Sequence, residues 1–295
     1  MALIHSERDN VWEFETEELR GFIQPEGERH GVKEVLHKPT GIQVVHPKFD
    51  VFNLFLLFST NHWMGQARLL ERSVRAEGDS LEVRFEPNEE HKAELTATYH
   101  VKEPNIIDLA VTVRSHWPYP AYEVFLSSYF DTSMVPHVFV AGGQFADPPD
   151  QDQWIAPVLS DVFVGTGLVF ARDQHAARRS TDGRWDRIWG TYQWNPQRFY
   201  ARPLMCQTDP ESRVAAALMS RPEDCYAVIS GYDTPNLADH FKDQNPLYLS
   251  LFGEDLVPGS ERTVRARFQV TETDAALSPL VPLHDAFLAE CPGGG

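Results

Sequence analysis

Apolar and polar side chains alternate over three consecutive segments between residues 94 and 131. Apolar residues occupy positions 95, 97, 99 and 101 of the first segment and positions 107, 109, 111 and 113 of the second. A period of two is typical of antiparallel strands that bury one face and expose the other. Lys102-Glu103-Pro104-Asn105, between these two segments, predicts a tight turn. The stretch therefore predicts an antiparallel meander.

Strand patterns recur along the rest of the chain, whereas helical patterns are few. The sequence has 21 prolines, which disrupt the interiors of helices. The other predicted strands are 42–45, 52–58, 81–85, 162–170, 214–219, 226–232, 247–252 and 263–270. So many strands in one chain predict two large sheets packed face to face. We expect an all-β sandwich that forms a single domain over residues 1–290, a disordered tail at 291–295, and long loops between Gly142 and Trp194.

The charge balance argues against nucleic acids and anionic membranes as partners. The chain has 43 Asp and Glu against 26 Lys and Arg, a formal net charge of -17, which repels phosphate backbones and anionic lipids. A small neutral or mildly charged ligand is favoured. We find neither a leader pattern nor an apolar run long enough to span a bilayer, so we expect a cytoplasmic protein. The sequence leaves the oligomeric state open.

The sequence predicts no cofactor. Three widely spaced cysteines, Cys206, Cys225 and Cys291, favour reduced thiols over disulfides or a zinc knuckle. None of the 12 histidines has a local metal-binding spacing such as HxH or HExxH, so a metal site would have to be assembled from distant strands. Dinucleotide fingerprints and phosphate-binding loops are also absent from the sequence.

His62 and Trp63 precede Arg68 in a short segment with functional potential. An imidazole can transfer a proton near neutral pH, an indole can stack on a sugar ring, and a guanidinium can bind hydroxyls. The alternative is a surface loop whose tryptophan only packs.

Ser127, Tyr129 and Asp131 share one face of the third strand, because side chains alternate. A phenol beside a carboxylate can donate to a sugar oxygen or exchange a proton. The alternative is the solvated face of an ordinary strand. His137, a few residues further on, could supply an imidazole to this site.

A dense aromatic run near residue 190 is also suited to sugar binding. Carbohydrates stack on aromatic rings, and guanidinium groups bind their hydroxyls or carboxylates. Gly190 and Pro196 interrupt the run, which favours a platform at a loop or strand edge over core packing. The residues of this run and its neighbouring arginines are Trp185, Trp189, Tyr192, Trp194, Arg198, Phe199, Tyr200 and Arg202.

Four segments resemble the galactose mutarotase-like (aldose 1-epimerase-like) superfamily. They are IQPEGERHGVKEVLHKPTG (23–41), NHWMGQAR (61–68), the 94–131 meander, and LYLSLFGEDLVPGSERTVRARFQV (247–270). The resemblance implies a β-supersandwich and a ring-opening or ring-closing reaction at the anomeric carbon of a sugar. In such a reaction histidines and an aspartate would place protons, and a glutamate would act as the base.

The resemblance carries over only in part. His62 and Arg68 fall where the family has its loop histidine and its sugar-holding arginine. The family's second histidine precedes the Tyr-Phe pair, where this chain has Ser127 and Ser128. The strand that would carry the base glutamate reads Leu249-Ser250-Leu251 here, and its nearest acid is Glu254. Both departures count against ordinary mutarotase chemistry.

The function favoured by these patterns is acid–base chemistry at or near a sugar anomeric centre. His62 and Tyr129 are the predicted proton carriers, and Arg68 and Arg202 would orient the sugar. His137 and Asp131 are further catalytic candidates, and Trp63, Trp189, Tyr192, Trp194 and Glu254 are the other predicted substrate contacts. One alternative is a lyase or hydrolase of oligosaccharides with Tyr129 as base. A second is a carbohydrate-binding sandwich without catalysis.

Overall fold

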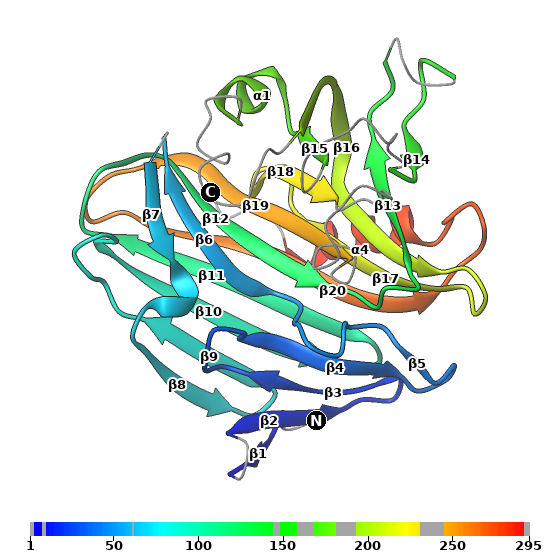
Figure 1. The fold of residues 1–295 in the computed structure, drawn as a ribbon, viewed down its shortest axis with the longest axis horizontal. Coiled ribbons are helices and arrows are strands. Elements are labelled where there is room, and N and C mark those ends of the chain that lie inside the picture. Colours follow the sequence, from blue (N-terminus) through cyan, green and yellow to red (C-terminus); the bar gives the residue numbers. More distant parts are fainter. Residues whose placement is uncertain are drawn as a thin grey trace.

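The structure is a computed structural model that describes residues 3–7, 10–60, 62–143, 148–157, 168–180, 193–230 and 245–291, with only the backbone at 62–63, 178–180 and 193–197. Its N-terminal sheet has five strands, drawn in dark blue in Figure 1. In spatial order they are β1 (Ile4–Ser6), β2 (Val11–Glu15), β3 (Leu19–Gln24), β4 (Gly31–His37) and β5 (Ile42–Gln43).

A second, much larger sheet forms the rest of the described fold. Its order is β7-β6-β12-β19-β18-β15-β16-β17-β20-β11-β10-β9-β8. The bounds are β6 (Asn53–Ser59), β7 (His62–Gln66), β8 (Arg72–Glu77), β9 (Ser80–Phe85), β10 (Ala93–Lys102), β11 (Ile106–Ser115), β12 (Tyr119–Tyr129), β15 (Leu168–Ala171), β16 (Gln193–Asp209), β17 (Val214–Ser220), β18 (Cys225–Ser230), β19 (Pro246–Leu256) and β20 (Glu261–Glu272). β13 (Val135–Val140) pairs with β16 and with β14 (Gln153–Ile155).

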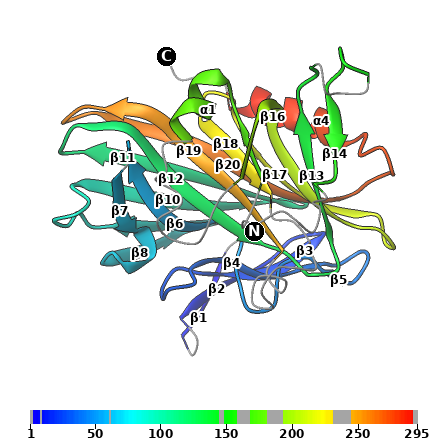
Figure 2. The ribbon, with the colours of Figure 1, turned by 45° about the horizontal axis from the view of Figure 1, so that its top comes forward.

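The long strand β16 lets the large sheet form two layers. It pairs in parallel with β15 near its start and antiparallel with β17 further along. Figures 1 and 2 show β6, β12 and β19 in one layer and β20, β11 and β10 in the other. Apolar side chains from both layers, such as Leu126 and Phe268, pack in one buried cluster between them. This architecture confirms the predicted all-β sandwich of two face-to-face layers.

The first two strands of the 94–131 stretch form the predicted antiparallel pair. The prediction of a meander is wrong for the third strand, because β12 pairs with β6 and β19 in the other layer and not with β11. Along β10 every second side chain is buried, and β10 pairs with β11 with Tyr99 opposite Leu109. The prediction of long loops from Gly142 to Trp194 is wrong in part, because β14, β15 and α1 (Gln174–Ser180) lie in this interval. The predicted strand at 42–45 is shorter, ending at Gln43, and the helix α4 (Leu280–Glu290) was not predicted.

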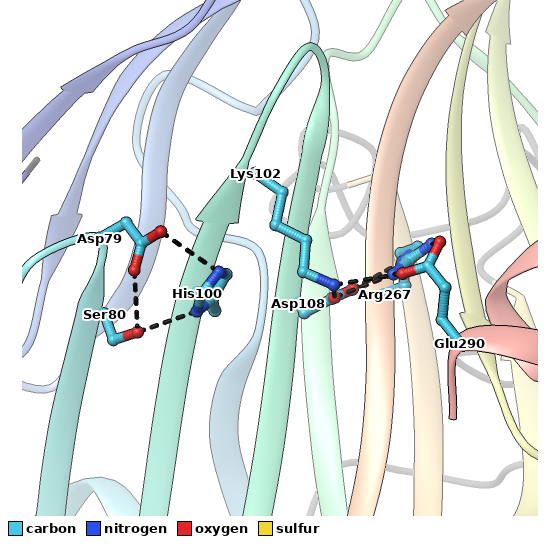
Figure 3. A network of polar contacts seen from close by, with 7 residues as sticks. All are labelled: Asp79, Ser80, His100, Lys102, Asp108, Arg267 and Glu290. Atoms are coloured by element: carbon cyan, nitrogen blue, oxygen red, sulfur yellow. Dashed lines mark hydrogen bonds and ion pairs between the residues drawn. The ribbon is translucent and has the colours of Figure 1, made fainter. Parts of the chain in front are cut away.

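Helix α4 is held on the outer face of the large sheet by an ionic network (Figure 3). Arg267 on β20 donates from Nε and Nη2 to the Asp108 carboxylate, at 2.6 and 2.9 Å, and from Nη2 to Glu290 Oε2 at 2.6 Å. Lys102 Nζ lies 2.7 Å from the same aspartate. The Arg267 side chain is only 1% exposed. Leu280 and Phe287 complete the attachment by packing on the apolar face of β16 and β17.

Gly31 allows the N-terminal sheet to pair with the segment that leads into β6. The Val32 N–H donates to the Val51 carbonyl at 2.8 Å, and the Val51 N–H donates to the Val32 carbonyl at 2.9 Å. Gly31 has φ +133°, and a Cβ there would lie 2.5 Å from the Val51 carbonyl oxygen. Only glycine accepts this conformation at this separation. The pairing brings Lys33 of β4 close to Asp50.

No helix among the described residues combines the length and the apolar character that crossing a bilayer would require.

Candidate functional site

The outer face of β6, β12 and β19 carries the row of polar side chains expected from the sequence. On β12, Leu126 and Phe130 point into the main core, so Ser127 and Tyr129 lie on the opposite face. Ser127 is opposite Asn53 on β6 and Tyr248 on β19. Side chains from three neighbouring strands therefore meet here.

Aromatic rings continue this row in both directions. Phe49 stacks on Tyr129 with ring centroids 4.8 Å apart, and Tyr129 meets Tyr248 edge-on at 6.1 Å. Tyr248 in turn stacks on Phe125 at 4.9 Å. Tyr129 is partly exposed, whereas Tyr248 and Phe125 are buried. Phe49 and Tyr129 are partly exposed, and partly exposed rings with polar neighbours are suited to contact with sugars.

Two arginines lie against this aromatic row. The Arg29 guanidinium, from the loop between β3 and β4, lies 4.0 Å from the centroid of Phe49. The Arg68 guanidinium, on the short 3-10 helix η1 (Ala67–Leu69), lies 4.7 Å from the centroid of Phe55. Arg68 Nε donates to Gln66 Oε1 at 2.5 Å. The arginines therefore place positive charge beside Tyr129.

Asp50 lies buried behind Tyr129. Burial raises the pKa of its carboxyl to about 7, although Lys33, the Asn53 side chain, Arg29 and Arg68 each lower it. Among the described residues, neither carboxylate oxygen has a hydrogen-bond partner of normal geometry. A buried acid with a strongly shifted pKa, next to cations and a partly exposed phenol, is typical of a functional site.

The Tyr129 phenol stays protonated at neutral pH. Burial and the Asp50 charge raise its pKa, and the hydroxyls of Tyr248 and Ser127 lower it by a smaller amount. A protonated phenol donates a hydrogen bond or a proton. The Tyr129 hydroxyl can therefore donate a hydrogen bond in this arrangement.

A second buried acid lies on the same face, further along β12. Ser250 Oγ on β19 donates to Glu123 Oε2 at 2.5 Å, and the Glu123 side chain is fully buried. The resemblance places a base glutamate on the strand of Ser250. Here the neighbouring strand brings a carboxylate to Ser250 instead.

Two of the predicted catalytic residues make local contacts. The Asp131 carboxylate accepts hydrogen bonds from the Ser133 N–H and Oγ at 2.9 and 2.7 Å, which closes the turn after β12. His137 Nδ1 lies 3.0 Å from the Val135 carbonyl oxygen. His137 shares a strand face with Phe139, which packs with the α4 cluster. It is thus on a different face of the sandwich from Tyr129.

Two of the predicted substrate contacts also lie elsewhere. Arg202 forms an ion pair with Asp285 of α4, because the alternation along β16 turns it toward that helix with Leu204. Glu254 Oε1 accepts a hydrogen bond from Arg262 Nε at 2.8 Å. Glu254 pairs with Tyr122, whereas Pro246 at the other end of β19 pairs with Tyr129.

The remaining predicted contacts fall where side chains are not described. His62 and Trp63 begin β7, with His62 opposite Ser59 in the hairpin with β6; their side chains lie outside the described residues. Trp194 lies on β16 with its side chain outside them too, and Trp189 and Tyr192 lie wholly outside.

The described residues bring no three His, Cys, Asp or Glu side chains together in a way that could hold a metal ion.

Comparison with solved structures decides the fold. A putative aldose 1-epimerase from Escherichia coli K12 matches at 9% identity over 89% of this chain and 99% of its own, with a TM-score of 0.53. A GalM/aldose epimerase homologue from Caenorhabditis elegans matches at 10% identity, 90% and 100% coverage, and a TM-score of 0.51. The chain has the galactose mutarotase-like fold. The resemblance seen in the sequence is thus confirmed at the level of the fold.

The chain is also similar to part of a longer protein. A TPR-domain containing protein from Parabacteroides distasonis matches at 12% identity over 92% of this chain, with a TM-score of 0.52, and this chain spans 48% of its length. No protein-family model matches the sequence, and no curated protein is similar to it. The chain is therefore a divergent example of this fold.

Sequence reasoning missed Asp50, Lys33, Arg29 and Tyr248. Asp50 had a local signal, since it is a lone acid that directly precedes the apolar run of β6. Arg29 and Lys33 lie in the segment 23–41, which resembles the family only in its pattern. Nothing in the sequence shows that this segment meets residue 50 through Gly31.

Proposed function

We propose that the chain binds a sugar against the outer face of β6, β12 and β19 and interconverts its anomers, with the Tyr129 phenol as proton donor. One observation carries this proposal: Tyr129, a partly exposed residue whose phenol stays protonated, lies within a row of stacked rings and next to Arg29. The rings would hold the apolar face of the sugar, and the phenol would meet its oxygens.

The proposed reaction needs one donor and one acceptor of protons. As the bond between the anomeric carbon and the ring oxygen breaks, Tyr129 would protonate the ring oxygen. A base would take the proton of the anomeric hydroxyl, so that a carbonyl forms at the anomeric carbon. Closure on the other face of the carbonyl would yield the other anomer. His62, on the second strand from β12 in the sheet, is the other proton carrier that the sequence predicts, and it would act as this base.

Tyr129 fits this reaction better than the lyase alternative. A lyase of the kind considered above would need Tyr129 as a base, which requires the phenolate. The raised pKa of Tyr129 disfavours the phenolate at neutral pH. Sugar binding without catalysis is the second candidate, and the presence of Ser127 where the family has a histidine favours it.

Anomer exchange measured by NMR tests the proposal directly. The purified chain would be added to aldoses at anomeric equilibrium, neutral and acidic, and exchange between the two anomeric proton signals would be followed. We expect exchange faster than in buffer for at least one sugar. Sugar binding without faster exchange would select the non-catalytic candidate, and a new unsaturated uronate absorbance with acidic oligosaccharides would select the lyase.

A further inference from the structure

Three basic side chains near Asp50 make no ion pair within the described part of the chain. Arg29, Lys33 and Arg68 have no carboxylate oxygen within 4.0 Å there. In contrast, Arg262 pairs with both Asp224 and Glu254, and Arg267 pairs with both Asp108 and Glu290. A chain with a formal charge of -17 has many acids available. Unpaired cations gathered in one place therefore point to an external anion.

Both arginines are oriented by contacts that leave donors available. The face of the Arg29 guanidinium lies over Phe49, which itself stacks on Tyr129. Arg68 lies over Phe55. Among the described residues, only its Nε donates a hydrogen bond to a side chain, that of Gln66. Guanidinium groups that stack on rings keep their edge N–H groups for bidentate binding of carboxylate, sulfate or phosphate.

Lys33 and Asp50 complete the electrostatic surroundings. Lys33 is partly buried on β4; burial lowers its pKa, and the Asp50 charge opposes this shift. Asp50 is fully buried, and its raised pKa leaves it partly neutral near pH 7. Glu28 lies near Arg68 and Glu34 near Lys33, but neither forms an ion pair with them. The two arginines are therefore the groups best placed to meet an anion beside Tyr129.

We propose that Arg29 and Arg68 bind the anionic substituent of an acidic sugar whose ring lies against Tyr129. This inference rests on the proposed function in one respect, since it takes the ligand to be a sugar. It adds the ligand class: a monosaccharide or terminal sugar that carries a carboxylate, sulfate or phosphate group. Lys33 contributes at longer range by favouring negative charge at the same place.

Matched pairs of neutral and acidic sugars test this specificity by calorimetry. Galactose and galacturonate differ by a carboxylate, glucose and glucose 6-phosphate by a phosphate, and glucose and glucose 6-sulfate by a sulfate. We expect at least one acidic member to bind about tenfold or more tightly than its neutral partner at low salt, with a smaller advantage at high salt. The pair with the largest ratio identifies the anionic group. Equal affinity within every pair would overturn the inference, as would inorganic phosphate or sulfate binding as tightly as the sugars.

Charge-removing variants identify the residues. Arg29→Gln and Arg68→Gln should each weaken binding of the acidic sugar by about tenfold and weaken binding of its neutral partner by less. Arg75→Gln is the matched control, because Arg75 is exposed on β8 and pairs with Glu77. Thermal melts would show that each variant is folded. Unchanged affinity for the acidic sugar in both folded variants would overturn the assignment.

The two proposals fail in different ways. Selective binding of an acidic sugar without anomer exchange would contradict the proposed function and support the inference. Exchange of neutral sugars without any preference for acidic ones would support the function and overturn the inference.

Discussion

The backbone N–H of Tyr129 donates to the carbonyl oxygen of Asp50 at 3.0 Å. This bond fixes the end of β12 against the segment that leads into β6. The phenol that faces outward and the acid that lies buried thus belong to neighbouring, hydrogen-bonded residues. A change in the charge of Asp50 should change the pKa of Tyr129, because the Asp50 charge is one cause of the raised Tyr129 pKa.

Replacing Tyr129 with phenylalanine should remove most of the catalysis and keep the stacking. A proton donor of this kind accounts for about a hundredfold to ten-thousandfold in rate, so Tyr129→Phe should lower the anomer exchange rate by that range. Tyr119→Phe is the control, since this variant removes only the hydroxyl that accepts a hydrogen bond from the Lys92 N–H. Exchange as fast in Tyr129→Phe as in the wild type would rule out the phenol as donor.

Asp50→Asn should stabilise the protein at high pH relative to the wild type. The folded-state pKa of Asp50 is raised from 3.8 to about 7, so its contribution to stability is fully present below pH 3.8 and is lost as the pH rises through 7. The difference in unfolding free energy between variant and wild type should therefore grow in favour of the variant from pH 4 to pH 8, by on the order of 4 kcal/mol.

Urea unfolding at several pH values measures this difference. Asp150→Asn, at an exposed position, should leave the pH profile of stability unchanged. If the difference in unfolding free energy between Asp50→Asn and the wild type does not change with pH, Asp50 is not buried as an isolated acid.

Gly31→Ala should loosen the attachment of the N-terminal sheet. The substitution forces a positive φ on alanine and places its Cβ 2.5 Å from the Val51 carbonyl oxygen, so we expect a loss of about 2–4 kcal/mol. At Gly41, φ is +70° and a Cβ would meet no atom within 4 Å, so Gly41→Ala should cost only about 1 kcal/mol. Denaturant melts that give equal losses would contradict the proposed close approach.

Glu290→Gln should weaken the attachment of α4. Arg267 holds the pKa of Glu290 at about 2, below the ordinary 4.5, so this stabilisation is present above pH 4.5 and is lost as the pH falls through 2. The Glu290 side chain is 46% exposed, and screening limits the expected loss to about 1 kcal/mol at pH 7. Glu77→Gln, in an exposed pair with Arg75, should be nearly neutral. The two variants can be compared by urea unfolding at pH 7 and near pH 3, where the Glu290 effect should shrink.

The strands that alternate over ten residues could be predicted from the sequence, because each buries one face on the common core. The paired strands β10 and β11 follow this rule throughout. The short strands β1 to β4 could not be predicted in the same way, since their burial is irregular and depends on pairing with distant segments. Helix α4 was missed because Pro282 lies within it; a proline in the first turn removes no helical hydrogen bond.

The sequence predicted which residues of β12 belong to the candidate site, but it did not predict which residues of other strands and loops join them. Ser127 and Tyr129 share a face as expected. Arg202 and Glu254 were assigned by their chemistry, but the strand period directs one toward α4 and the strand pairing places the other at the far end of β19. Asp50 joins the site only through contacts between segments far apart in the sequence, which no local pattern encodes.

The pairing at Gly31 means that the candidate site is built from two sheets. Arg29 and Lys33 come from the N-terminal sheet and its loop, whereas Tyr129 comes from the large sheet. A ligand that touches both would have to be released before the two sheets could separate. Binding would therefore slow hydrogen exchange of amides in β3 and β4, far more than in strands such as β17 that lie away from this junction.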